Sequence, residues 1–218
     1  MSQSFFKTVK QQWALALRDK RFVRAFLPAF AGIVLIASFL PSFYKYIENR
    51  QGIILNDWLL HIIPAQNVSF EIFSIIWGTV FFVLYRALLS PEILLRFLYA
   101  YVLFIITRSL CLLVVPLDPP TEIMELVDPI TDIFYGGTFI TKDLFYSGHT
   151  CTMVIVCLSM EKKQERIILG FLSVVLMFLL LIQHVHYTVD IVFGVIFGII
   201  CSQCGKRILQ KMPSFVKE

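Results

Sequence analysis

The chain of 218 residues is 58% hydrophobic and only 16% charged, and its mean hydropathy is +0.78. A soluble domain cannot bury so much apolar surface in one core, so this composition excludes a soluble globular protein and indicates an integral membrane protein. The formal net charge of +4 does not indicate a nucleic acid partner. In a membrane protein, the positions of the basic residues relative to the membrane are what carries information.

The first 24 residues predict a cytoplasmic surface helix rather than a signal peptide, because they lack a long apolar core. Phe6, Val9, Trp13, Ala16 and Leu17 recur at helical spacing among basic residues. This pattern is typical of an amphipathic helix on the inner leaflet, and a solvated helix packed on cytoplasmic loops fits it equally well.

Six apolar stretches follow, and they predict an all-α protein with six transmembrane helices. They cover residues 25–44, 68–85, 93–115, 148–160, 167–183 and 188–204. A helix needs roughly 20 residues to cross a bilayer, so the fourth stretch is too short. We therefore expect a surface segment (1–24), one six-span domain (25–205) and a basic cytoplasmic tail (206–218).

The basic residues orient these spans. If the N-terminus is cytoplasmic, 15 of the 19 Lys and Arg lie on the cytoplasmic side, and the exceptions are Lys45, Arg50, Arg108 and Lys142. The positive-inside rule favours this arrangement, in which both termini are cytoplasmic. The identity of the membrane is left open.

Ionisable residues within the spans indicate a candidate site, because charged groups are costly at membrane depth. At about 1.5 Å per residue, Arg108 and His149 each lie roughly 18 Å from the cytoplasmic boundary, and Glu71 and Asp190 lie about 22 to 24 Å from it. The hydrocarbon core is about 30 Å thick. These groups are therefore expected to converge in the outer half of the membrane, on its non-cytoplasmic side.

The motif DLFYSGHT, residues 143–150, opens the short fourth span. If that helix begins at Ser147 or Gly148, its N-terminus stops inside the outer leaflet, and the chain before it must line a cavity. Ser147 is a natural N-cap, and Gly148 permits close approach. The free N–H groups of the first turn then offer a phosphate site beside His149.

A second motif, HVHYTVDIVFG (residues 184–194), places Asp190 one helical turn after His186. A carboxylate at this spacing can accept an imidazole N–H, fix its tautomer and make the other ring nitrogen a better nucleophile or base. A polar residue satisfied at a helix end explains a lone H-x-x-x-D equally well. Two histidines, a carboxylate and Arg108 at matching depth favour a site, whereas His184 is expected to be structural or at the rim.

SGHT followed about forty residues later by HYTVD resembles the paired signatures of the sphingomyelin synthase family, within the type 2 phosphatidic acid phosphatase superfamily of six-span lipid enzymes. The resemblance covers about residues 57–204. It implies that His149 is the general acid and base, that His186 is the nucleophile and that Asp190 orients His186. The residues expected to bind substrate are Arg108, Ser147, Gly148, Asp143, Glu71 and Tyr187.

The chain departs from the phosphatases of that superfamily in ways that bear on its substrate. It lacks their K-x6-R-P motif, and it carries Leu180 where they have an arginine. Thr141 and Lys142 replace the cysteine-glycine pair of animal synthases. Fewer cations suit a phosphodiester better than a dianionic phosphomonoester.

These features together predict a membrane phosphotransferase. It would move a phosphoryl headgroup from a phospholipid donor to a ceramide-like or diacylglycerol acceptor through a phosphohistidine, without a metal or other cofactor. Hydrolysis of a lipid phosphate by water and a non-catalytic scaffold are the alternatives. The acidic stretch from Asp118 to Asp132, with Glu122, Glu125 and Asp128, indicates either a site that attracts choline or ethanolamine or a solvated loop. The oligomeric state is left open.

Overall fold

The computed structural model of the chain describes residues 2–126 and 140–211, which form helices, connecting segments and one isolated β-bridge between Ile53 and Leu117. The helices are α1 (Ser2–Arg18), α2 (Lys20–Glu48), α3 (Trp58–Ile62), α4 (Ser69–Leu89), α5 (Pro91–Val114), α7 (Gly148–Ser159), α8 (Lys163–Ile182) and α9 (Thr188–Lys211).

Five of these helices, α2, α4, α5, α8 and α9, are long and apolar enough to cross a membrane. Large apolar side chains on their outward faces, such as Leu35, Phe70 and Phe171, are exposed, which suits a surface that faces lipid. The prediction of an all-α, multi-pass membrane protein is confirmed for the described residues. The sixth span and the cytoplasmic position of the termini stay predictions.

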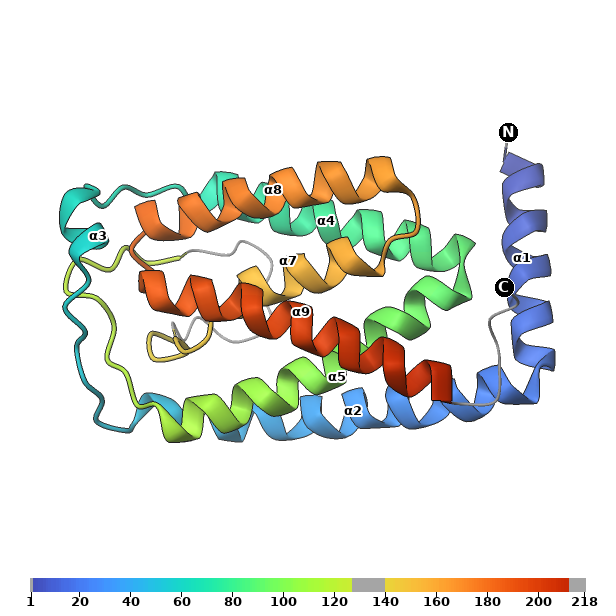
Figure 1. Ribbon diagram of the computed structural model, residues 1–218, viewed down its shortest axis with the longest axis horizontal. Coiled ribbons are helices and arrows are strands. Elements are labelled where there is room, and N and C mark those ends of the chain that lie inside the picture. Colours follow the sequence, from blue (N-terminus) through green and yellow to red (C-terminus); the bar gives the residue numbers. More distant parts are fainter. Residues whose placement is uncertain (1, 127–139, 212–218) are drawn as a thin grey trace.

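The helices run along one axis, with α1 lying across one end of the bundle (Figure 1). The turn into α2 is capped by Asp19, whose side chain accepts a hydrogen bond from the Arg21 N–H (2.8 Å). The Trp13 indole donates to the Leu88 carbonyl (2.9 Å) and so ties α1 to the end of α4. The predicted surface helix therefore ends at Arg18, and residues 20–24 already belong to α2.

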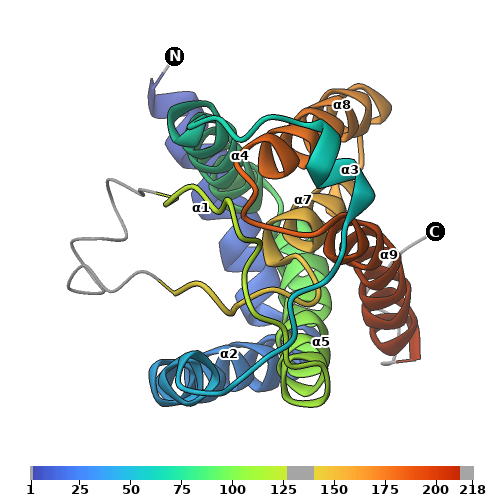
Figure 2. The same cartoon turned by 90° about the vertical axis from the view of Figure 1, so that its left-hand side faces the viewer.

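Helix α7 lies near the centre of the bundle, where it packs against α5, α8 and α9 (Figure 2). Its 12 residues extend for only about 18 Å, which is less than the thickness of a hydrocarbon core. Figure 1 shows that α7 begins well inside the bundle rather than at its end. Residues 140–147, which precede this helix, form a coil.

Two glycines allow α9 to lie directly against α7. A Cβ atom on Gly194 would lie 2.9 Å from the Ser147 carbonyl oxygen, and one on Gly198 would lie 2.8 Å from the Val154 Cβ. Side chains at these positions would push the two helices apart. Since α7 begins at one histidine motif and α9 at the other, this contact fixes the two motifs relative to each other.

One side of the bundle is less closely packed. Helix α2 packs on α5, and α4 packs on α5 and α8, but extensive packing between α2 and α4 is absent from the described helices. Figure 2 places these two helices at different corners of the bundle. The space between them belongs to the cavity described next.

Candidate active site

The site begins at the N-terminus of α7. The Ser147 hydroxyl oxygen accepts a hydrogen bond from the Thr150 N–H (3.4 Å), so Ser147 caps the helix, and α7 starts at Gly148. The Ser147 N–H donates to the Asp190 carbonyl at 3.0 Å. This bond joins the first turn of α7 directly to the first turn of α9.

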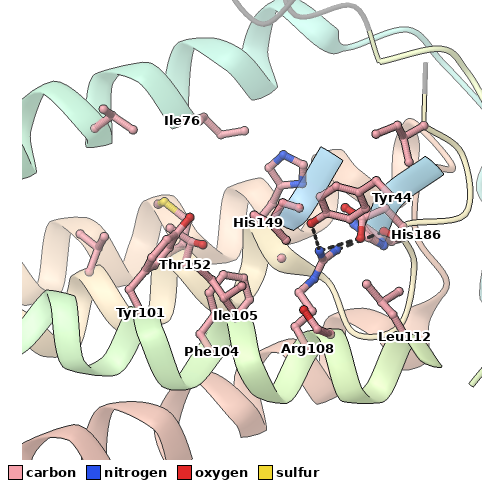
Figure 3. A pocket seen from close by; sticks show the side chains of 18 of the residues that line it. Tyr44, Ile76, Tyr101, Phe104, Ile105, Arg108, Leu112, His149, Thr152 and His186 are labelled. Carbon is pink, nitrogen blue, oxygen red and sulfur yellow. Dashed lines mark hydrogen bonds and ion pairs between the residues drawn. The ribbon is translucent and has the colours of Figure 1, made fainter. Parts of the chain in front are cut away.

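A cavity of about 600 Å³ opens beside this turn, between α2, α4, α5 and α7. Its polar end contains Arg108, Asp143, Gly148, His149 and His186 (Figure 3). Its remaining length is mainly apolar, and representative lining residues are Ile33, Leu40, Ile76, Val83, Phe104 and Val156. Phe97 and Leu112 mark its extent along α5, a rise of about 22 Å.

His149 and His186 meet at the polar end although they come from different segments. His149 lies in the first turn of α7, and His186 lies in the connection between α8 and α9. Their ring centroids are 6.3 Å apart, and the ring planes are inclined by 66°. Both side chains line the cavity, so one group bound there can contact both rings.

Asp190 supports His186 from behind. The His186 Nδ1 atom lies 3.5 Å from the Asp190 Oδ2 atom, which is within ion-pair range but longer than a well-formed hydrogen bond. The same carboxylate oxygen accepts from the Tyr187 N–H (3.0 Å), and Asp190 is completely buried. A proton held on Nδ1 by this carboxylate leaves the lone pair of the imidazole on Nε2.

Arg108 is bound mainly by the chain that leads into α7. Its Nε donates to the Tyr146 carbonyl (2.9 Å), and its Nη2 donates to the Asp143 carbonyl (3.1 Å). Its Nη1 lies 2.6 Å from the Asp143 Oδ1 atom and donates to the Tyr44 hydroxyl (3.1 Å). Every guanidinium nitrogen thus has a protein partner.

Gly148 packs on the face of that guanidinium. A Cβ atom at this position would lie 3.0 Å from both the Cζ and the Nε atoms of Arg108. The absence of a side chain on Gly148 therefore lets α7 begin directly against Arg108. The close approach expected for Gly148 is thus made to a protein side chain.

A set of polar contacts, which we call the end clamp, holds residues 141–142 in place. The Glu48 carboxylate accepts from the Thr141 N–H (3.0 Å), the Thr141 hydroxyl (2.6 Å) and the Lys142 N–H (3.0 Å). The Lys142 ammonium lies 2.8 Å from the Asp118 Oδ1 atom and also donates to the Arg50 carbonyl. The clamp joins the ends of α2 and α5 to the coil before α7.

The Asp118 carboxyl of the end clamp lies outside the spanning helices. The hydrogen bond and the charge of Lys142, with a further bond from the Gly52 N–H (3.3 Å), lower the pKa of Asp118 below its ordinary value. The Tyr187 hydroxyl donates to the Asp118 carbonyl (2.9 Å) and accepts from the Leu55 N–H (3.2 Å). This loop is thereby connected to the His186 segment.

Three residues expected to bind substrate do not line the cavity. Ser147 and Tyr187 are buried, with their polar atoms bonded to the protein. Glu71 lies in the first turn of α4 on an exposed face. Counting residues along a helix estimates depth but not the direction of the side chain, and Glu71 does not point into the cavity.

The acidic stretch touches the cavity through Ile123 and Leu126, but its described glutamates do not line it. Glu122 and Glu125 are exposed, and neither lines the cavity. Asp128 and Asp132 fall outside the described residues. His184 is buried, and its Nε2 atom lies 2.9 Å from the Ile63 carbonyl oxygen, which accords with a structural role.

Two further residues hold the site, and sequence reasoning missed both. Asp57 caps α3 through the Leu59 N–H (3.1 Å), and it also accepts from the Thr188 N–H (2.6 Å) and hydroxyl (3.0 Å) at the start of α9. Gln183 is fully buried and donates to Ser69 and to the Glu125 carbonyl. The position of Asp57 before an apolar run indicates a helix cap, but no sequence pattern indicates its contact with Thr188.

Comparison with known proteins agrees with this geometry. Residues 142–205 match the family model described as PAP2 superfamily C-terminal. The matched segment contains α7, α8 and most of α9, and therefore both histidine motifs. The search of curated proteins and the search of solved structures gave no match. The family match supports a relationship to the type 2 phosphatidic acid phosphatase superfamily and suggests an enzyme of the lipid phosphatase or phosphotransferase type.

Proposed function

We propose that this protein is a membrane phosphotransferase that moves a phosphoryl headgroup from a glycerophospholipid to a lipid alcohol. One observation carries the proposal: a single cavity has the two histidines at one end and an apolar lining over the rest of its length. A lipid substrate has the same division, with a phosphate at one end and acyl chains at the other. The catalytic unit would be residues 25–205.

The proposed reaction has two displacements. In the first, the Nε2 atom of His186 forms a bond to phosphorus, and the bond from phosphorus to the diacylglycerol oxygen breaks while His149 gives that oxygen a proton. In the second, His149 takes the proton from the acceptor hydroxyl, whose oxygen bonds to phosphorus as the bond to His186 breaks. Asp190 holds His186 in the required tautomer throughout.

The first turn of α7 supports the developing negative charge in this proposal. In this proposal, its backbone N–H groups and the positive end of the helix dipole act where the phosphoryl oxygens would lie, beside Gly148 and His149. His186 is only 3% exposed, which would limit the access of water to a phosphohistidine. Transfer to a ceramide-like or diacylglycerol acceptor is therefore favoured over hydrolysis.

The donor is proposed to be a phosphodiester. Arg108 is the only Lys or Arg that lines the cavity within the described residues. A phosphomonoester carries about one more negative charge at neutral pH than a diester does, so it needs more cationic partners. Phosphatidic acid is accordingly expected to be a poor substrate.

A product analysis tests this function. The purified protein in mixed micelles is given a phospholipid with a labelled headgroup, with or without ceramide or a diacylglycerol whose acyl chains differ from those of the donor, and the lipids are separated by chromatography. Label that appears in a new lipid only when the acceptor is present supports the transferase. Release of inorganic phosphate from phosphatidic acid, with no acceptor-dependent product, would instead identify a phosphatase.

The non-catalytic alternative has its own test. Rapid denaturation at alkaline pH during turnover of a donor with labelled phosphorus should leave label on the protein, because the P–N bond of a phosphohistidine is labile in acid but survives in alkali, and this label should be absent after His186→Ala. A protein that gains no label and forms no product from a phosphodiester lipid or from phosphatidic acid would be a scaffold.

A further inference from the structure

The closest charged pair in the cavity joins Arg108 to Asp143. Their Nη1 and Oδ1 atoms are 2.6 Å apart, and the Arg108 side chain is only 8% exposed. Asp143 is 29% exposed and, like Arg108, lines the cavity. A phosphate bound beside His149 would therefore meet a cation that already has a carboxylate partner.

Nearby cations of the end clamp do not change this balance. The Lys142 ammonium lies against Asp118, and the Arg50 guanidinium donates to the Leu112 and Leu113 carbonyls. Neither side chain lines the cavity. On the other wall, His186 faces the carboxylate of Asp190. The polar end thus contains no cation without an anionic neighbour among the described Lys and Arg residues.

We propose that Asp143 determines which phosphate charge the site accepts. By neutralising Arg108, it admits the single negative charge of a phosphodiester and rejects the dianion of a phosphomonoester. This inference rests on the proposed function and names a specificity residue for it. A protein charge of the same sign as the ligand is a common means of discrimination, because repulsion weakens the binding of the more highly charged ligand far more than that of the intended one.

The charge of the Asp143 side chain can be removed without moving the segment that carries it. The Asp143 main-chain carbonyl also accepts a bond from Arg108, as does that of Tyr146. These bonds remain when the side chain changes, so the coil before α7 stays attached to Arg108. Asp143→Asn therefore removes the charge at nearly constant shape, and Asp143→Glu keeps the charge as the matched control.

The experiment compares substrates that share the same acyl chains. The value of kcat/KM is measured for phosphatidic acid and for the better of phosphatidylcholine and phosphatidylethanolamine, in wild type and both variants. We expect Asp143→Asn to raise the ratio of monoester to diester activity at least about tenfold, and Asp143→Glu to leave the ratio near that of wild type. An unchanged ratio in an active Asp143→Asn protein overturns the inference.

A binding measurement covers the case in which Asp143→Asn turns over too slowly. A lipid phosphonate with a dianionic headgroup and its monomethyl ester are tested for their stabilisation of the detergent-solubilised protein against thermal unfolding. Greater preference for the dianion in Asp143→Asn than in wild type supports the inference, and equal preference overturns it. Failure of wild type to transfer a headgroup from either diester would instead contradict the proposed function.

Discussion

The side chain that Gly148 lacks decides where Arg108 can lie. The guanidinium lies only 3.0 Å from the position that a Cβ atom would take, and from there it reaches the carbonyls of Asp143 and Tyr146. Gly148, Arg108 and the coil before α7 therefore form one interdependent unit. In such a unit, a small change at one residue displaces another residue that reacts or binds.

Gly148→Ala is expected to reduce headgroup transfer several-fold, because the added methyl group would lie 3.0 Å from the Arg108 guanidinium and would displace it from its bonded position. Gly78→Ala is the matched control, since a Cβ atom at Gly78 would meet no neighbour within 4 Å. Initial rates in mixed micelles measure the difference. A Gly148→Ala protein as active as the Gly78→Ala protein would show that the position of Arg108 does not matter to turnover.

The proposed roles of the histidines lead to a second prediction. His149→Ala and His186→Ala should each reduce turnover by about 10²-fold to 10⁴-fold or more, because each removes a proton transfer or the nucleophile. Asp190→Asn should lose much of the rate. Thermal unfolding of each variant in detergent checks that the fold is retained. Wild-type activity of His186→Ala at saturating donor would refute its role as the nucleophile.

At the residue scale, the two motifs were sufficient to select side chains that the structure brings to one place. His149, His186 and Asp190 lie together, although their catalytic roles stay predictions. Sequence spacing placed Glu71 at a similar depth but could not give the face of α4 on which it lies. It also could not reveal Asp57, because the partner that Asp57 holds at α9 is distant in sequence.

At the element scale, the close contact between α7 and α9 aligns the two motifs. Apolar periodicity located the spanning helices, but it marked only their apolar parts, so α2 extends beyond the expected 25–44 to Lys20–Glu48. The start of α7 inside the bundle, rather than at its end, was predictable from its cap and from the short length of its apolar stretch. The glycines of α9 gave no signal of which helix they would contact.

The glycine contact leads to a prediction about stability. Gly198→Ala should destabilise the protein by about 1 to 3 kcal/mol, because the added methyl group would overlap Val154 in a tightly packed interface. Gly78→Ala should be neutral or slightly stabilising, since alanine favours a helix over glycine. Thermal or denaturant unfolding in one detergent compares the two variants. Equal stability of both would mean that α7 and α9 can separate without cost.

At the scale of the whole molecule, the two ends of the bundle differ. The end clamp, α3 and the start of α9 lie at one end, and α1 lies across the other (Figure 1). The proposed orientation places the clamp on the non-cytoplasmic side. The clamp joins segments that are far apart in sequence, which is why composition and charge could predict the spans but not the contacts that close this end.

Labelling tests that orientation. In a variant without its five native cysteines, Trp58→Cys and Gln164→Cys place single thiols at opposite ends of the bundle. In sealed membranes of known sidedness, an impermeant maleimide should reach Trp58→Cys from the non-cytoplasmic face. It should reach Gln164→Cys only after permeabilisation. The reverse pattern would invert the proposed topology.

The end clamp should also make stability depend on acid pH. The pKa of Asp118 is lowered in the folded protein, so its contribution is present above the ordinary carboxyl pKa and is lost as the pH falls through the lowered value. Because the pair with Lys142 is partly exposed, we expect Asp118→Asn to cost no more than about 1 kcal/mol at neutral pH. Thermal unfolding across the acid range should show this difference from wild type shrinking as the pH falls. A difference that stays constant would rule out the carboxylate charge as its source.

The space between α2 and α4, which belongs to the cavity, has a kinetic consequence for the proposed reaction. Substrates that arrive between these helices approach within the plane of the bilayer, so the mole fraction of each lipid in the membrane governs the rate rather than its concentration in the bulk sample. Adding inert detergent at constant total lipid should slow transfer by surface dilution. The protein would thus respond directly to the composition of its own membrane, without any change in the aqueous phase.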